Sequence, residues 1–152
     1  MNVNEALQVA TTFLIACTFL VYVFQLHAMR SASTAQNILA VLNYLQEPSV
    51  REARRRVLVD LKQKPVVSWT EDDKREASLV YATYDVAGIL IQHGLVPKDL
   101  FVSNWGESIV RCYRVLEPFL KELHSSVPGT KYGEYLKWLR DEAVRSGISG
   151  GA

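Results

Sequence analysis

The feature that most constrains this chain is a stretch near its N-terminus, residues 6–29, in which no side chain carries a full charge and only His27 could acquire one. The segment from Leu7 to Leu26 would rise about 30 Å as an α-helix, which is the thickness of a bilayer's hydrocarbon core. We therefore predict a transmembrane helix over residues 6–29, preceded by a short N-terminus of residues 1–5.

Two other interpretations of this stretch compete with a membrane helix. A cleaved signal peptide usually starts with positive residues and has a shorter apolar run, whereas residues 1–5 contain no lysine or arginine. The buried core helix of a soluble protein is usually shorter and less uniformly apolar. The length and uniformity of the stretch favour the membrane helix over both alternatives.

Flanking charges predict how this helix would be oriented. Arg30 follows the apolar stretch directly, and four more arginines lie within residues 51–56. The N-terminal flank has Glu5 and the α-amino group. Because positively charged flanks stay on the cytoplasmic side, we expect the N-terminus outside and the rest of the chain in the cytoplasm.

The part of the chain after the apolar stretch has the length of one domain. Residues 30–145 suffice for one compact core and are too few for two. Lysine and arginine total 17 against 16 for aspartate and glutamate. This balance gives no general attraction to polyanions, so nucleic acid is not an expected partner. We expect a cytoplasmic helical domain over residues 30–145 and a flexible tail over residues 146–152.

Helix signals start soon after the apolar stretch. Ser33 and Gln36 have the spacing of a capping box, which predicts a helix that begins there. Alternatively, the apolar helix continues without interruption, because no helix-breaking residue lies between Arg30 and Ser33. Pro48 is well placed as the first residue of the next helix, in which apolar residues repeat at helical spacing as far as Leu61.

Caps and breakers delimit the later helices as well. Thr70 precedes three acidic residues, the pattern of an N-cap whose first turn suits the helix dipole; this helix should end at Gly94. Pro97 opens another helix, in which Pro118 is expected to cause a kink or a restart. A final helix is predicted over residues 132–143 from its spaced apolar residues.

Strand signals are almost absent from the sequence. Residues 66–69 are the one strand-like stretch, and they are too short to build a sheet. Helices that each have one apolar face and short connections pack as bundles. We therefore predict an all-α protein, with one N-terminal transmembrane helix followed by a small bundle of about five helices.

Catalytic and metal-binding patterns are missing from the sequence. None of His27, His93 and His124 stands near cysteine or carboxylate residues at zinc-ligand spacing. No phosphate-binding glycine loop and no nucleophile-elbow motif is present. We predict no catalytic residue, no metal site and no cofactor, and we do not expect an enzyme.

One carboxylate stands out among the predicted inner positions. Asp85 lies beside Tyr81 and Gly88 at the edge of the apolar stripe of its helix. The favoured interpretation is a structural ion pair with Arg111 or Arg114, because half-buried carboxylates need partners. The functional alternative is a polar groove in the bundle lined by Tyr81, Tyr84, Asp85, Trp105, Arg111 and Arg114.

The arginine run forms a second candidate site. If these side chains faced the membrane, each would contribute about 1 kcal/mol of attraction to anionic lipid. The alternative is a solvated face that is partly neutralised, with Glu52 pairing to Arg55 or Arg56 and Asp60 to Arg56. The candidate lipid-facing basic patch consists of Arg51, Arg54 and Arg55.

A set of spaced residues in the chain resembles a known family. The pattern comprises Trp69, residues 84–90, residues 94–100, Trp105, residues 113–120 and Tyr132. It resembles a bacterial family of small single-pass membrane proteins with a helical domain of unknown function. The resemblance implies a bacterial inner membrane and an all-helical domain, and it implies no activity. One departure is Lys121, which stands where the family pattern suggests an arginine.

These observations favour one class of function. An anchored domain without catalytic motifs is expected to be an interaction module, a scaffold or accessory protein of unknown specific role. Its expected partners are the lipid bilayer and another membrane or cytoplasmic protein, or further copies of itself. The alternative is a membrane-tethered sensor or effector, in stress response or phage defence, that binds a ligand in a groove of the bundle.

Overall fold

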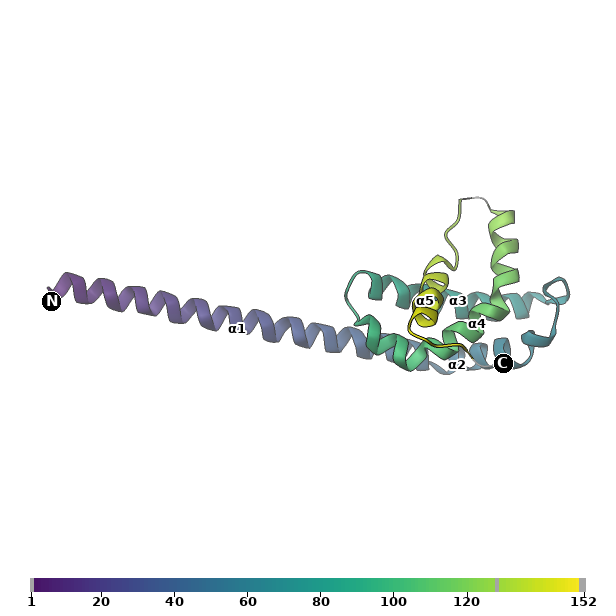
Figure 1. The fold of residues 1–152 in the computed structure, drawn as a ribbon, viewed down its shortest axis with the longest axis horizontal. Helices are drawn as coiled ribbons and strands as arrows, with labels where there is room; N and C mark the ends of the chain where they lie inside the picture. Colours follow the sequence, from purple (N-terminus) through teal and green to yellow (C-terminus); the bar gives the residue numbers. More distant parts are fainter. Residues whose placement is uncertain (1, 128, 151–152) are drawn as a thin grey trace. The chain divides into compact units, whose positions relative to one another are not determined.

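The computed structural model describes residues 2–127 and 129–150. All the regular secondary structure in these ranges is helical, as predicted. Residues 1, 128 and 151–152 lie outside this description. The predicted N-terminus (residues 1–5) and the predicted tail (residues 146–152) are therefore described only in part. The chain divides into two compact units, Met1–Asn37 and Ile38–Ala152. Its elements are α1 (Val3–Gln46), α2 (Pro48–Val59), η1 (Leu61–Gln63), η2 (Val66–Ser68), α3 (Glu71–Gln92), α4 (Lys98–Ser126) and α5 (Glu134–Arg145) (Figure 1).

The first unit is helical throughout its described length beyond Asn2. Ala10–Gln46 of α1 is long and apolar enough to cross a membrane by length and composition, and none of its most apolar window is buried. The hydroxyls of Thr11, Thr12 and Thr18 each donate to a carbonyl four residues earlier, at 2.8 Å. These bonds satisfy the hydroxyl donors without water, so they are compatible with an apolar surrounding.

Helix α1 does not restart at the predicted capping box. Ser33 and Gln36 lie inside the continuous helix, and the hydroxyl of Thr34 donates to the carbonyl of Arg30 at 3.0 Å. An N-cap residue must leave the helical conformation, and no glycine or proline at residues 30–46 forces it to do so. The prediction of a helix start at Ser33 is therefore wrong, and the alternative of an uninterrupted helix is confirmed.

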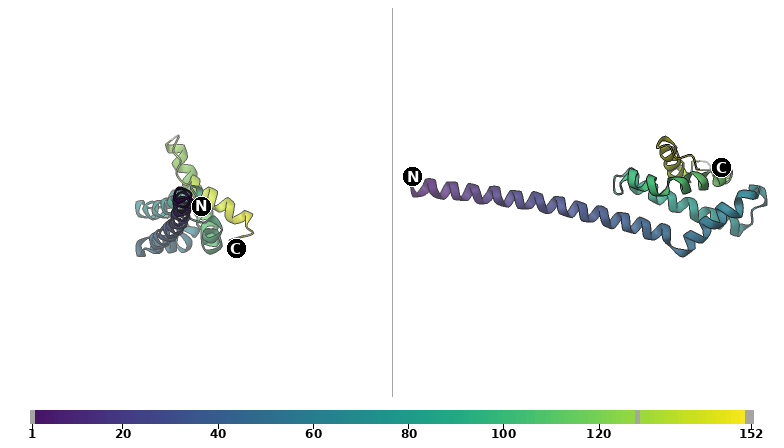
Figure 2. Two further views of the ribbon diagram at one scale, coloured as in Figure 1. Left: turned by 90° about the vertical axis from the view of Figure 1, so that its left-hand side faces the viewer. Right: turned by 60° about the horizontal axis from the view of Figure 1, so that its bottom comes forward.

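The second unit consists of the end of α1 from Ile38 onward and helices α2–α5. Helix α5 packs on α4 and α3, and α2 packs on α3 (Figures 1 and 2). The apolar faces of these helices meet in one main core, so the packing provides most of the helical stability. Its fully buried large side chains are Leu45, Val57, Leu61, Val80, Tyr84, Ile109, Cys112, Leu116, Leu136 and Leu139.

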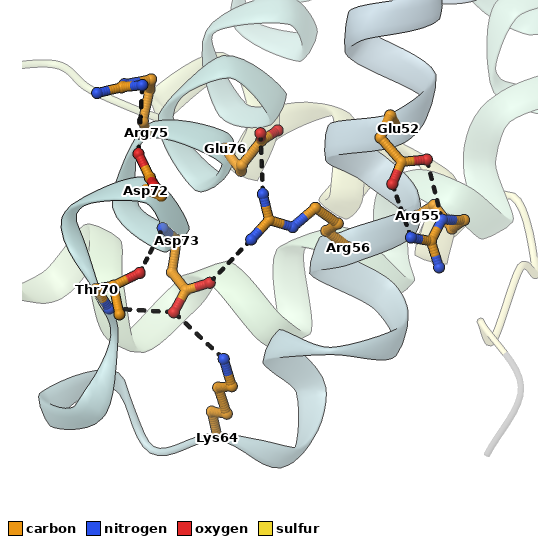
Figure 3. A network of polar contacts seen from close by, with 9 residues as sticks. All are labelled: Glu52, Arg55, Arg56, Lys64, Thr70, Asp72, Asp73, Arg75 and Glu76. Carbon is orange, nitrogen blue, oxygen red and sulfur yellow. Dashed lines mark hydrogen bonds and ion pairs between the residues drawn. The ribbon is translucent and has the colours of Figure 1, made fainter.

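Asp73 holds the junction between α2 and α3. Thr70 caps α3 as predicted: its hydroxyl accepts from the amide of Asp73 at 3.2 Å, and its own amide donates to Asp73 at 3.1 Å. Lys64 and Arg56 reach the same carboxylate at 3.4 and 3.5 Å (Figure 3). The backbone hydrogen bond from Thr70, aided by Lys64, lowers the pKa of Asp73. This contribution to stability is present above the unfolded-state pKa and is lost as the pH falls through the folded-state value.

Helix α4 runs through Pro118 to Ser126 and changes direction in its C-terminal half (Figure 1). A proline inside a helix removes one backbone donor and displaces the preceding turn. The chain therefore bends near Pro118 and does not start a new helix there.

The described part of the predicted tail packs on α4. The amide of Ile148 donates to the carbonyl of Ala143 at 3.1 Å. Its side chain joins a small apolar cluster with Val102, Val110 and Ala143. Gly150 is buried so closely against Val110 that an added Cβ would lie 2.5 Å from that side chain. Residues 146–150 thus cover one face of α4.

Gly88 marks the closest approach of α3 to α5. A Cβ at this position would lie 2.7 Å from the Cβ of Tyr135 and 3.2 Å from its carbonyl oxygen. Because backbone cannot move aside as a flexible side chain can, we expect Gly88→Ala to destabilise the fold by about 1–3 kcal/mol, despite alanine's higher helix propensity. Chemical denaturation would measure this loss. Ser78→Ala on the same helix is the control, and equal stability of the two variants would contradict the close approach.

Candidate functional site

Asp85 caps a neighbouring helix from the side. Its two carboxylate oxygens accept hydrogen bonds from the amides of Gly133 at 2.7 Å and Leu136 at 2.8 Å. Gly133 is the N-cap residue of α5, and it has no side chain that could accept a hydrogen bond from the amide of Leu136, as an N-cap side chain usually does. Asp85 therefore supplies the acceptor that the N-terminus of α5 lacks, and its charge suits the positive end of that helix.

Burial has the larger effect on the acidity of this carboxyl group. Burial raises the pKa of Asp85 above its ordinary value, while the amides of Leu136, Gly133 and Tyr135 oppose the shift. Arg111, one of the two partners expected for Asp85, lies 3.6 Å from Glu107 on its own helix. The local geometry of Asp85 thus fits a structural cap better than a catalytic acid.

Tyr81 lies on the same part of α3 as Asp85. Its ring centroid is 6.0 Å from that of Tyr132, in a tilted arrangement typical of aromatic pairs. Burial raises the pKa of Tyr81, and the nearby Asp85 adds to the shift. Tyr81 and Asp85 therefore help to fix the segment that leads into α5.

Arg54 is directed into the helical domain. Its guanidinium lies 4.8 Å from the centre of the Trp105 ring, within the range of a cation–π contact. One terminal nitrogen, Nη1, is buried and has no hydrogen-bond acceptor among the residues that the structure describes. The signal for this placement is the spacing of Arg54 from Val50 and Val57, which put it on the buried face of α2.

Two buried titratable groups lie near Arg54. The hydroxyl of Tyr84 is 2.8 Å from that of Ser108. Burial raises the pKa of Tyr84 far above its ordinary value and that of Cys112 to about 12, and the charge of Arg54 opposes both shifts. Both groups therefore stay neutral at physiological pH, and neither is an activated nucleophile.

The other two residues of the predicted basic patch are exposed on α2. Arg55 forms two hydrogen bonds to Glu52, at 2.7 and 3.0 Å, as the sequence suggested. Arg51 is exposed one turn earlier. The structure thus brings Arg51 and Arg55 to one exposed face, whereas Arg54 contacts Trp105 in the domain. Arg56 pairs with Glu76 at 3.2 Å as well as with Asp73 (Figure 3).

An open groove lies between α4 and the connection from α2 to α3. Its volume is about 480 Å³, which falls within the usual range for small-molecule sites. Apolar side chains form most of its surface, and every charged lining residue is a cation. The lining residues are Leu58, Leu61, Lys62, Lys64, Pro65, Val66, Val67, Arg111, Arg114, Val115 and Pro118.

The residues of the predicted polar groove separate into three places. Tyr81 and Asp85 support α5, Tyr84 and Trp105 meet Arg54 in a packed cluster, and Arg111 and Arg114 line the open groove. The open groove is therefore not the predicted one, since it contains the two arginines and none of the other four residues, and its opposite wall was not predicted from the sequence. That wall has little sequence signal, because it consists of a short irregular connection with two 3₁₀ turns.

Metal binding has no support from the described geometry. Among the side chains that the structure describes, no group of three or more histidine, cysteine, aspartate or glutamate residues is arranged to hold a metal ion. The charged cluster around Asp73 instead pairs carboxylates with cations, which neutralise one another (Figure 3).

Comparison with known proteins gives one match. No curated protein and no solved structure matches the chain. A family model described as a domain of unknown function, DUF4760, matches residues 12–142. This match covers most of the chain and bears out the resemblance to a family of uncharacterised domains. Because the match covers more than half of the chain, the chain belongs to the DUF4760 family of domains of unknown function.

Proposed function

We propose that this chain is a single-pass membrane protein whose helical domain acts as an interaction module in the cytoplasm, at the inner (plasma) membrane of a bacterium. The observation that carries the proposal is the combination of an exposed apolar helix with a separately packed domain. The arginines after the apolar segment support an outside N-terminus. The partner is another membrane or cytoplasmic protein, or a second copy of the chain.

Anchoring explains how a small domain could work without a large interface. Two proteins confined to one membrane meet at a raised effective concentration, which can increase apparent affinity by about 10²–10⁴-fold. A modest contact surface then suffices for association. The proposal therefore requires that binding depend on the anchor as well as on the domain.

Crosslinking in native membranes tests this requirement. A photoreactive amino acid at an exposed apolar position, such as Leu100 or Val86, is expected to give discrete adducts in the full-length protein. In a variant that lacks residues 1–29, the adduct yield should fall at least about tenfold at equal expression. Monomer alone in the full-length sample, or equal adduct yields with and without the anchor, would contradict the proposal.

A ligand sensor is the second candidate function, and the open groove favours it. The groove has the volume of a ligand site and a mostly apolar surface with a few charged groups, as ligand pockets usually do. Its place between α4 and the α2–α3 connection would let a bound molecule influence how these two elements pack.

A further inference from the structure

The groove beside α4 has a one-sided charge. Lys62 and Lys64 come from the connection between α2 and α3, and Arg111 and Arg114 come from α4. None of the described residues that line the groove is acidic. A site with cations on both walls attracts negative charge and repels positive charge.

Local acidic partners only partly neutralise this charge. Lys64 pairs with Asp73 at 3.4 Å, and Arg111 lies 3.6 Å from Glu107, a long contact between exposed side chains. The exposed pair of Arg111 contributes little and leaves this cation available to another anion, whereas Lys64 stays paired with the buried carboxylate of Asp73. Lys62 is exposed and has no ion-pair partner within the described ranges. Lys62 and Arg111 therefore give the groove a positive character beyond these local pairs.

The remaining surface of the groove is apolar. Leu58, Leu61 and Val115 form buried or half-buried parts of the lining. Val67 is 94 % exposed, although it lies in an ordered 3₁₀ turn between Pro65 and Trp69. The turn is held in place by the indole of Trp69, which donates to the carbonyl of Lys64 at 3.2 Å. An apolar side chain fixed in water at the edge of a groove gains from burial against a ligand.

From these features we infer that the groove binds a single-chain amphipathic anion, an alkyl chain with a carboxylate or phosphate head. The alkyl chain lies along the leucine and valine side chains, which removes apolar surface from water. The head is bound by Arg111 from one wall and Lys62 from the other, and arginine provides paired donors for such oxygens. This inference rests on the second proposed function, since it names the ligand class of the sensor.

Photolabelling of the full-length protein in nanodiscs of neutral phosphatidylcholine tests the inference. The probe is a diazirine-bearing long-chain alkyl phosphate, and labelled peptides are identified by mass spectrometry. We expect labels within residues 58–67 and 111–118. Dodecyl phosphate should compete for labelling, whereas dodecanol, which has the same chain without the charge, should not. Equal competition by dodecanol, or labels spread over other surfaces of the helical domain (residues 38–150), would overturn the inference.

Charge-neutralising variants make the test specific. Lys62→Gln with Arg111→Gln removes one cation from each wall, and both side chains are exposed, so the fold should be unaffected. Labelling at the groove is expected to fall about tenfold. The control, Arg75→Gln with Lys131→Gln, removes two exposed cations outside the groove and should label as the wild type does. Equal loss in both double variants would overturn the inference.

Two further experiments answer two separate questions: whether the ligand comes from the bilayer or from water, and whether the sensor proposal stands if this ligand class is wrong. Nanodiscs that contain an anionic lysophospholipid, a single-chain lipid of the bilayer, without added competitor, would reduce labelling if bilayer lipid fills the groove. Unchanged labelling would assign a water-borne amphiphile to the same site. Native mass spectrometry of the purified protein reports any other bound molecule. If such a molecule were found while the phosphate probe failed, the ligand class would be wrong and the sensor proposal would stand.

Discussion

Asp85→Ala should lower the free energy of unfolding by about 2–4 kcal/mol, because it removes the charged acceptor of two amides at the N-terminus of α5. The loss should exceed that of an ordinary N-cap, since Gly133 offers no substitute side chain. The amides of Gly133 and Leu136 would be left without this acceptor in a partly buried place. Thermal and urea denaturation of the full-length protein in nanodiscs, followed by near-ultraviolet circular dichroism, would measure the change.

Two variants give this prediction its controls. Asp72→Ala removes an exposed carboxylate from the first turn of the same helix, where a surface pair with Arg75 and a favourable interaction with the helix dipole are lost; its effect should stay below about 1 kcal/mol. Asp85→Asn keeps the shape and one acceptor oxygen, so it should cost less than Asp85→Ala. Wild-type stability in Asp85→Ala would show that α5 does not depend on this cap.

The pH dependence of Asp85→Asn has a definite sign. Burial raises the folded-state pKa of Asp85 above the unfolded-state value. A raised pKa means that the carboxyl's contribution is fully present below the unfolded-state pKa and is lost as the pH rises through the folded-state value. Asparagine does not titrate, so the stability advantage of the wild type over Asp85→Asn should be larger at low pH and shrink as the pH rises.

Local sequence signals predicted most of the helix boundaries. Pro48 begins α2 and Thr70 caps α3, because both residues act through their own backbone and the next few amides. The helix predicted over residues 132–143 is α5, Glu134–Arg145. The capping box at Ser33 gave a wrong prediction. Such a local signal sets the start of a helix only where the preceding residues leave the helical conformation, and residues 30–32 do not.

Partners of the polar side chains were harder to predict than the helices. Asp85 was expected to pair with an arginine, but its carboxylate binds backbone amides of α5, which lie far along the sequence. Such contacts depend on how the helices pack, and amide groups have no signature in the sequence. The placement of Arg54 could have been found, since it shares a helical face with Val50 and Val57. It was missed because an arginine is usually assigned to the solvent.

Charged substitutions in the apolar part of α1 should have a large effect if that helix crosses a membrane. Ala16 and Phe19 are exposed and contact no core. Two arginines at these positions would cost about 5–7 kcal/mol near the centre of a bilayer. We expect Ala16→Arg with Phe19→Arg to move most of the protein from the carbonate-resistant membrane pellet to the soluble fraction, or to cause its degradation.

The design separates the three interpretations of this segment. If the segment were instead the core helix of a soluble protein, the wild type would already be in the supernatant, so the two arginines could not move it out of the membrane pellet. A cleaved signal peptide would be revealed by the intact mass of the wild type, which would lack the N-terminal segment. Ser125→Arg with Ser126→Arg, at the exposed end of α4, adds the same charge and should leave the protein in the membrane pellet. A wild-type protein of full mass that stays in the supernatant would exclude the anchor. A helix inserted in a bilayer would hold the whole chain in the membrane pellet, because moving so apolar a segment into water costs much free energy.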